Sequence, residues 1–444
     1  MTFFDTCAIQ RPSEMLRHPN TLRRIQQTVA THSSFFSTFT PQPSEAIQHS
    51  LNTPNLFAAF TALANEHQAI NLGQGFPTFG TPQFVIDNVA KAVNNQPFNQ
   101  YSRPGGHLQL NQTLATHYTP EFNQKLDPIS NICTFTGAQG GLFNTIQSFL
   151  NPGDEICTIE PYFDAYKKAA DVVGAVTIGV PLRLPSTATT ASDYKIDIDE
   201  LRATLTPKTK MLMLNTPHNP TGKVFDMQEL QDIADVVRDF PNLLVVSDEV
   251  YEYSTFQPKT HARFANIKDM WERTISLYSA GKTFSCTGWR IGYAIGPDEL
   301  IKPLIAAQGV LSFCAATPLE IAVGYSMEDA KENNYFNTFS NDLKRKQQLF
   351  IDVIQDSPLR PIAADGGYFV MCDTSELKVD RVENESRDFT VAKMLTERYG
   401  VTGIPTSPFY DVQNQHLSDN VIRFCFARKD EELEEAGRRL CKIE

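Results

Sequence analysis

Short apolar runs alternate with longer, helix-like stretches through the middle of this chain, and a polar or glycine-rich turn follows each run. Apolar runs of this length are typical of strands that are buried on both faces of a sheet. Such strands in alternation with helices predict an α/β fold with a mostly parallel sheet flanked by helices. The runs span residues 132–136, 156–160, 211–214, 243–247, 275–278 and 292–295.

Ligands of such sheets bind beyond the carboxyl ends of the strands. We therefore expect the chemistry in the polar clusters that follow the runs. The densest cluster covers residues 279–283, which read Ser-Ala-Gly-Lys-Thr, and Thr-Gly-Trp-Arg follows at 287–290. Any functional interpretation has to account for its lysine, Lys282.

The 444 residues are enough for two or three domains. Beyond about residue 325 the sequence is rich in helix-like stretches and has two apolar runs, 368–371 and 421–426, which predicts a smaller α+β domain. A helix that begins at Thr81–Pro82 would place on one face Val85, Ile86, Val89 and Val93. The predicted divisions are an extension at 1–50, an arm with part of the small domain at 51–95, a large domain at 96–324 and a small domain at 325–444.

The N-terminal extension differs in composition from the rest of the chain. Residues 15–44 contain three arginines, nine serines or threonines and no acidic residue, which is typical of a mitochondrial presequence. Asp5 and Glu14 argue against targeting from Met1, and a chance charge bias in an untargeted extension explains the pattern equally well. The expected location is therefore cytoplasmic or mitochondrial.

Composition excludes several classes of partner. The formal net charge is −12, and so acidic a protein repels the phosphate backbone of nucleic acids. No apolar run approaches the roughly 18 residues that a membrane span needs. None of the eight cysteines lies in a C-x-x-C pair or has a histidine at metal-ligand spacing, so we expect no metal site.

Two interpretations of the lysine cluster are excluded because the sequence lacks a residue or segment that each requires. A phosphate-binding P-loop needs a glycine five residues before Gly281, but Ser276 stands there. A serine hydrolase of the S-x-x-K type would use Ser279 as its nucleophile, but no K-T-G segment follows anywhere in the chain.

A lysine that binds pyridoxal phosphate covalently is the third interpretation, and it makes four demands. The cofactor's phosphate needs several donors and a cation, and its pyridine nitrogen needs a carboxylate that keeps it protonated. Its phenolic oxygen needs hydrogen-bond donors that lower the pKa of the imine formed with the lysine. The carboxylate of an amino-acid substrate needs an arginine that can bind both oxygens.

Candidates for all four demands lie at or near the ends of the predicted strands. Asp248 can pair with the pyridine nitrogen, and Tyr251 and Asn219 can donate to the phenolic oxygen. Arg423 would be a costly buried charge within its apolar run unless it bound a carboxylate. The phosphate would be held by the glycine-rich turn at 136–141, with Ala138 and Gln139, and by Ser279 and Arg290, while Phe163 would stack on the ring.

Eight blocks of sequence, taken in order, resemble those of the class I/II, fold-type I aminotransferases, and the resemblance covers residues 51–444. The blocks are NLGQGFP at 71–77, NQY at 99–101, TGAQGG at 136–141, EPYFD at 160–164, NTPHNPTGK at 215–223, SDEVY at 247–251, the segment from SAGKT to TGWR at 279–290, and RF at 423–424. Within the family they are similar to the kynurenine/glutamine aminotransferase and cysteine-conjugate β-lyase group.

The resemblance implies a large domain that binds pyridoxal 5'-phosphate on a mostly parallel, seven-stranded sheet, and a smaller α+β domain. It also implies a homodimer in which Tyr101 reaches the phosphate of the partner's cofactor, and a contact between the backbone of Gly75 and the substrate. Phe313 is expected to contact substrate. Family members often have an aromatic residue followed by histidine at this point, whereas here Cys314 follows Phe313, which weakens a prediction of kynurenine specificity.

The function that the resemblance implies is ping-pong transfer of an amino group from an L-amino acid to a 2-oxo acid. The donor would be kynurenine, glutamine, or an aromatic or sulfur amino acid. Lys282, Asp248 and Tyr251 would be catalytic, with Lys282 moving the proton of the substrate's Cα. A cysteine-S-conjugate β-lyase on the same cofactor and lysine is the alternative. A cofactor-sensing transcription regulator would need an N-terminal winged helix, for which 50 residues are too few.

Overall fold

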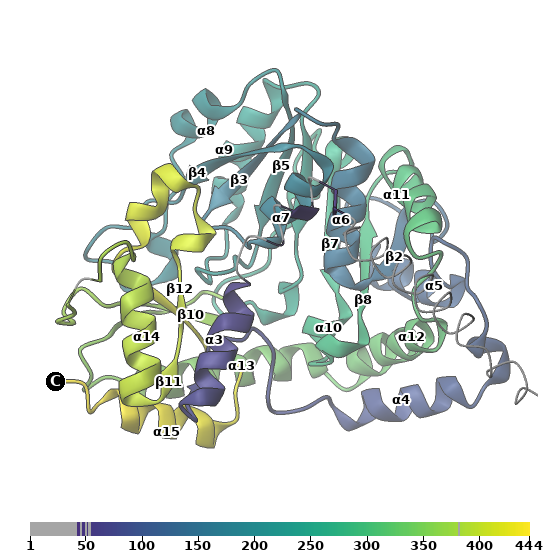
Figure 1. Ribbon diagram of the computed structural model, residues 1–444. Coiled ribbons are helices and arrows are strands. Elements are labelled where there is room, and N and C mark those ends of the chain that lie inside the picture. The colour runs from purple at the N-terminus through teal and green to yellow at the C-terminus, as the bar shows by residue number, and fades with distance from the viewer. Residues whose placement is uncertain (1–41, 45–46, 49–50, 52–54, 381) are drawn as a thin grey trace, which may run out of the picture. The chain divides into compact units, whose positions relative to one another are not determined.

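The computed structural model describes residues 42–44, 47–48, 51, 55–380 and 382–444. The chain divides into two units, Met1–Asn52 and Thr53–Glu444. In the first unit the described backbone is helical at 47–48 and 51. Almost all of the predicted extension, and of the proposed targeting segment within it, lies outside the described residues. The fold below is that of the second unit (Figure 1).

A seven-stranded sheet forms the centre of this unit, in the strand order β2-β8-β7-β6-β5-β3-β4. β8 runs antiparallel to both of its neighbours, whereas the pairs from β7 to β4 are parallel. The strands are β2 (Ile132–Thr136), β3 (Glu155–Glu160), β4 (Val176–Pro181), β5 (Thr209–Asn215), β6 (Leu244–Asp248), β7 (Thr274–Ser279) and β8 (Ile291–Ile295).

The six strands predicted from apolar runs are confirmed, each to within two residues. The strand that the runs did not indicate is β4, which lies at the edge of the sheet beside β3. Its first four residues are only partly buried or exposed, and it contains Gly179 and Pro181. An edge strand buries less surface and tolerates glycine and proline, so its sequence signal is weak.

Both faces of the sheet are covered, which explains why the runs are apolar throughout. Met211 and Met213 of β5 pack into a core with α6, α7 and α11, whereas Leu212 and Leu214 pack into a core with α8 and α9. The helices of this region are α5 (Leu108–Tyr118), α6 (Gly137–Phe149), α7 (Ala165–Val173), α8 (Ile198–Thr204), α9 (Met227–Arg238), α10 (Ala280–Thr283), α11 (Asp298–Leu311) and α12 (Thr317–Glu332).

Helix α4 (Gln83–Val93) begins where the sequence predicts, with Pro82 as its N-cap. The predicted buried face was partly wrong, because Ile86 and Val93 are exposed while Val85 is fully buried. The buried stripe runs through Asn88 instead, since α12 covers that side and Asp329 of α12 accepts a 2.7 Å hydrogen bond from Asn88 Nδ2.

A second, antiparallel sheet has the order β12-β13-β10-β9 and contains the two apolar runs predicted beyond residue 325. The helix α3 (Leu56–Glu66) contributes Leu56 and Phe60 to the same core, so an N-terminal segment packs with the C-terminal part of the chain (Figure 1). The remaining elements are β1 (Ile70–Asn71), β9 (Arg360–Ile362), β10 (Phe369–Asp373), β11 (Val401–Thr402), β12 (Ile404–Pro405), β13 (Val421–Cys425), α13 (Tyr335–Val353), α14 (Arg387–Tyr399) and α15 (Asp430–Leu440).

The predicted domain boundaries at residues 95 and 324 stay predictions. Among the described residues, no helix combines the length and apolar character that crossing a bilayer requires.

Replacing Phe350 of α13 with alanine tests the core around the second sheet. The side chain is fully buried, and its ring centroid lies 5.7 Å from that of Phe424. We expect Phe350→Ala to lower the free energy of unfolding by about 3–5 kcal/mol in urea titrations. Val412 is 84% exposed, so Val412→Ala should change it by less than about 0.5 kcal/mol. Equal losses in the two variants would contradict this assignment of the core.

Candidate active site

A cavity of about 380 Å³ lies beyond the carboxyl ends of β6 and β7, within the range typical of small-molecule sites. Eleven of the thirteen residues that the sequence predicts for the site line it. They are Gly75, Ala138, Gln139, Phe163, Asn219, Asp248, Tyr251, Ser279, Lys282, Arg290 and Arg423.

Lys282 lies in the middle of this set, in the short helix α10 directly after β7. Ser279 caps the helix, its Oγ accepting a 3.4 Å hydrogen bond from the Lys282 backbone N–H. The ammonium donates to Gly75 O at 2.5 Å and lies 5.2 Å from the ring centre of Tyr251. Burial lowers the pKa of Lys282 to about 8, and the Arg423 cation acts in the same direction. A neutral, nucleophilic amine is therefore accessible near neutral pH.

Asp248 ends β6 and presents its carboxylate to the cavity. Its Oδ2 accepts a 2.6 Å hydrogen bond from the hydroxyl of Tyr166, and its backbone carbonyl accepts one of 2.7 Å from Asn215 Nδ2. Burial raises the pKa of Asp248 to about 6, against the opposing effect of the Tyr166 hydrogen bond. The group is thus an anion at neutral pH and is suited to pairing with a cationic ring atom.

The N-terminus of α6 forms one end of the cavity. The first turn of a helix has backbone N–H groups without intrahelical partners, and those of Ala138 and Gln139 lie in this turn. Gly137 has a φ of +76°, and a Cβ there would lie 2.5 Å from Arg290 Nη2. Glycine therefore lets the Arg290 cation approach the helix start, and the combination suits a phosphate dianion.

Arg423 lies at another wall of the cavity, within β13 and 1% exposed. Its Nη1 donates to Asn219 Oδ1 at 3.0 Å and its Nη2 to Gly73 O at 2.8 Å, and the guanidinium stacks 4.0 Å from the ring centre of Phe369. Its Nε is buried without a hydrogen-bond partner among the described residues. Burial lowers the pKa of Arg423 to about 10, so it remains a cation with an unused donor, which suits a carboxylate ligand.

Tyr101 and Phe313 are the two predicted site residues that do not line the cavity. Tyr101 is 85% exposed, and its ring packs against that of Phe313 at a centroid distance of 5.4 Å. The predicted role of Tyr101 requires a second subunit, so it stays a prediction. The same holds for Phe313, which is 47% exposed and lies outside this chain's cavity.

Several residues of the cavity were missed from the sequence. Tyr166, which does not line the cavity but donates to Asp248, was missed as well; it is one turn after Phe163, with its backbone N–H donating to Phe163 O, and this spacing could have indicated it. Phe57 and Phe369 come from α3 and β10, far from the lysine block in sequence, and no local pattern marks them. The other residues that line the cavity are Gln74, Phe76, Leu142, Asn215, Val250, Leu277 and Thr287.

Comparison with known proteins decides the family. Residues 67–440 match the model of the family described as aminotransferase class I and II. The kynurenine–oxoglutarate transaminase of Dictyostelium discoideum is 39% identical over 425 residues, which cover 91% of this chain and 97% of that protein. The chain belongs to the class I and II aminotransferases.

Solved structures agree with the family. The crystal structure of Bna3p from Saccharomyces cerevisiae has a TM-score of 0.87 and 30% identity, covering 91% of this aminotransferase and 99% of that chain. That of YbdL from Escherichia coli, described as having a methionine aminotransferase function, has a TM-score of 0.82 and 28% identity, covering 91% and 100%. The predicted fold class and the transaminase type of enzyme are confirmed. The relatives favour transamination over the β-lyase alternative.

Titration of Lys282 in the ligand-free protein tests the electrostatics of the cavity. With a pKa of about 8, its reactivity should rise between about pH 7 and 9 and then level off. An ordinary lysine, in a reference peptide, should reach its midpoint near pH ~10.4. Competitive acetylation followed by mass spectrometry measures both. A midpoint for Lys282 equal to that of the peptide would contradict the described environment.

Proposed function

We propose that this aminotransferase uses pyridoxal 5'-phosphate to move the amino group of an L-amino acid with an aromatic or other apolar side chain, such as kynurenine, to a 2-oxo acid. The observation that carries the proposal is the position of Lys282 Nζ in one cavity with an anion-binding helix end and a buried arginine. A phosphate and a carboxylate are the two anions of such a cofactor and its substrate.

The residues around the cavity suit the cofactor on each side. The amides of Ala138 and Gln139, with Arg290 and Ser279, would hold the phosphate, and Phe163 would stack on the ring. Asp248 would pair with the pyridine nitrogen, and Tyr251 and Asn219 would donate to the phenolic oxygen. When bound to Lys282, the cofactor supplies an electron sink for the bonds at the substrate's Cα.

The chain's own contribution to the reaction is to orient the substrate and to move one proton. Arg423 would bind the substrate carboxylate through its free Nε and fix the direction of the Cα–H bond. The Lys282 amine, with its lowered pKa, would accept the Cα proton and return it one step later. Asp248, anionic at neutral pH, would keep the ring nitrogen protonated during both transfers.

A homodimer is part of the proposal. In a single chain the phosphate end is open, since Gln139 and Arg290 are exposed. Tyr101 and Phe313 form an exposed aromatic pair, and Val310, three residues before Phe313, is 85% exposed. Burial of these side chains in a subunit interface would let Tyr101 close the partner's cavity. The composition of residues 15–44 is that of a mitochondrial presequence, and an untargeted extension would leave the protein in the cytoplasm.

Lys282→Ala tests the assignment of the cofactor lysine. The purified wild-type protein should be yellow with bound pyridoxal phosphate, and Lys282→Ala should lose both its covalent chromophore and its turnover. Lys208 is exposed, so Lys208→Ala should keep both. Absorbance spectra and a coupled 2-oxo-acid assay measure the two properties. Normal transamination by Lys282→Ala, or a wild-type protein that does not bind the cofactor, would refute the proposal.

The walls of the cavity predict the preferred substrates. Phe57, Phe76, Val250 and Phe369 supply apolar surface, and the cations that line the cavity are Lys282, Arg290 and Arg423. With Arg423 bound to the α-carboxylate, a second substrate carboxylate would be buried without a matching cation, which costs about 1–3 kcal/mol. We expect kcat/KM for phenylalanine or kynurenine to exceed that for aspartate by about 10- to 100-fold. A preference for aspartate would contradict this view of the cavity.

A further inference from the structure

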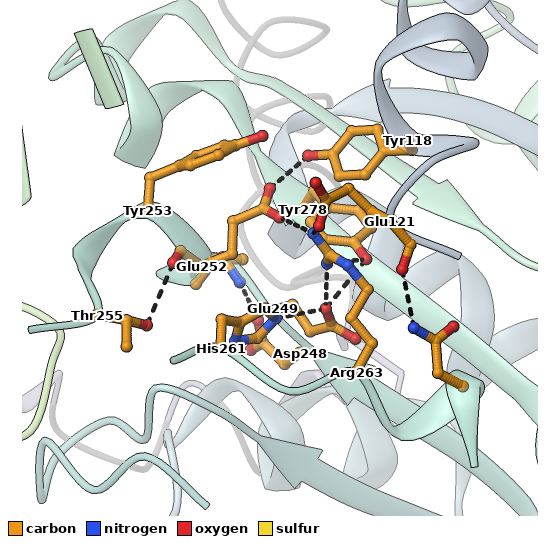
Figure 2. A network of polar contacts seen from close by, with 12 residues as sticks. Tyr118, Glu121, Asp248, Glu249, Glu252, Tyr253, Thr255, His261, Arg263 and Tyr278 are labelled. Atoms are coloured by element: carbon orange, nitrogen blue, oxygen red, sulfur yellow. Dashed lines mark hydrogen bonds and ion pairs between the residues drawn. The ribbon is translucent and has the colours of Figure 1, made fainter. Parts of the chain in front are cut away.

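The five residues 248–252 face two different sides. Asp248 and Tyr251 line the cavity, whereas Glu249 and Glu252 are buried on the opposite side of the segment and converge on Arg263 (Figure 2). β6 ends at Asp248 and the short 3-10 helix begins only at Glu252. The residues between are thus outside regular secondary structure, and side-chain contacts must contribute to holding their conformation.

Arg263 binds both carboxylates through one guanidinium group, an arrangement that we call the clamp. Its Nη1 donates to Glu249 Oε2 at 2.7 Å and to the hydroxyl of Tyr278 at 2.9 Å, and its Nη2 donates to Glu252 Oε2 at 2.7 Å. Arg263 is 6% exposed, and its guanidinium lies 5.2 Å from the ring centre of Tyr118. Because the guanidinium is planar and rigid, the two carboxylates are held at a defined separation.

The same division occurs on the neighbouring strand β7. Leu277 and Ser279 line the cavity, while Tyr278 between them turns to Arg263 and donates to Glu249 Oε2 at 3.0 Å. Successive side chains of a strand point to opposite faces, so Arg263 also braces the strand that leads to Lys282. The ionisable groups that face Arg263 and its two carboxylates are His117, Tyr118, Glu121, Tyr253, His261, Tyr278 and Tyr293.

We propose that Arg263 is a positioning residue that sets Asp248 and Tyr251 against the cofactor by clamping Glu249 and Glu252 from behind. This inference rests on the proposed function. If the clamp is lost, the segment can shift, and the Tyr251 hydroxyl and the Asp248 carboxylate move relative to the ring. A displacement of about 1 Å is enough to cost about 100-fold in rate.

The positive charge of Arg263 also helps to keep Asp248 in the state that pairs with the ring nitrogen. Despite burial, which opposes ionisation, the hydrogen bond from His261 and the charge of Arg263 hold the pKa of Glu249 at about 2. Glu249 is therefore an anion next to Asp248, whose pKa it raises. Without the Arg263 cation to balance it, the Glu249 anion would favour protonation of Asp248, which could then no longer pair with a protonated ring nitrogen.

The test is the pKa of the yellow lysine–cofactor chromophore, read from absorbance against pH in the absence of substrate. Donors to the phenolic oxygen and a carboxylate at the ring nitrogen both lower this pKa, so their displacement raises it. We expect Arg263→Met to raise it by about one pKa unit, a tenfold change in the proton equilibrium. kcat should fall about 10- to 100-fold while KM changes about twofold or less.

Two further variants separate positioning from general destabilisation. Arg263→Met leaves two buried carboxylates without their cation and can unfold the protein, whereas Arg263→Met with Glu249→Gln and Glu252→Gln leaves no unpaired charge. The triple variant should fold and still show the raised chromophore pKa, because the clamp is absent. The matched control is Lys346→Met, since Lys346 is a buried cation between Asp342 and Asp430. It should lower the melting temperature without moving the chromophore pKa.

A chromophore pKa equal to that of wild type in the triple variant would overturn the inference, and so would an equal shift in Lys346→Met. Partial recovery of the pKa by Arg263→Lys, which restores the cation but not the planar clamp, would support it. A wild-type protein without any chromophore would instead refute the proposed function, so the two failures are distinguishable.

Discussion

The structure of the site depends on the enclosure of one lysine ammonium. Lys282 Nζ has a backbone carbonyl as its hydrogen-bond acceptor and aromatic rings around it, and it shares the cavity with Arg423 and Arg290. Burial and the nearby cations both disfavour its charge, which lowers the pKa of Lys282 to about 8. The cavity therefore makes the amine reactive before any ligand binds, and a cofactor with an aldehyde is the partner that this chemistry suits.

The residues that hold the site in position lie on the opposite face of the strands that carry it. A parallel sheet brings strand ends to one edge, and in β7 alternate side chains turn either to the cavity or away from it. The residues that turn away are as polar as those that line the site, and Glu249, Glu252 and Tyr278 gather around Arg263 (Figure 2). A buried carboxylate requires a paired cation, so this cluster holds its members in fixed positions.

The strands and most of the site could be predicted from the sequence because their signals are local. β2 to β8, apart from β4, appear as apolar runs, and Lys282 and Asp248 stand directly after two of them. β4 was not predicted because an edge strand buries only part of its surface, so its residues do not form an apolar run. The exposed face of α4 was misjudged at Ile86 because the side that α12 covers depends on a helix more than 200 residues away, as the pairing of Asn88 with Ser326 shows.

The sequence by itself determined the alternation of strands and helices, the lysine after β7, the acid at the end of β6 and an arginine within an apolar run. Each of these follows from residue type and spacing along a few neighbouring residues. The tertiary structure alone decided that Phe57 and Phe369 line the cavity and that Arg263 binds two carboxylates behind it. Contacts between distant segments depend on how the elements pack, and no local pattern encodes that packing.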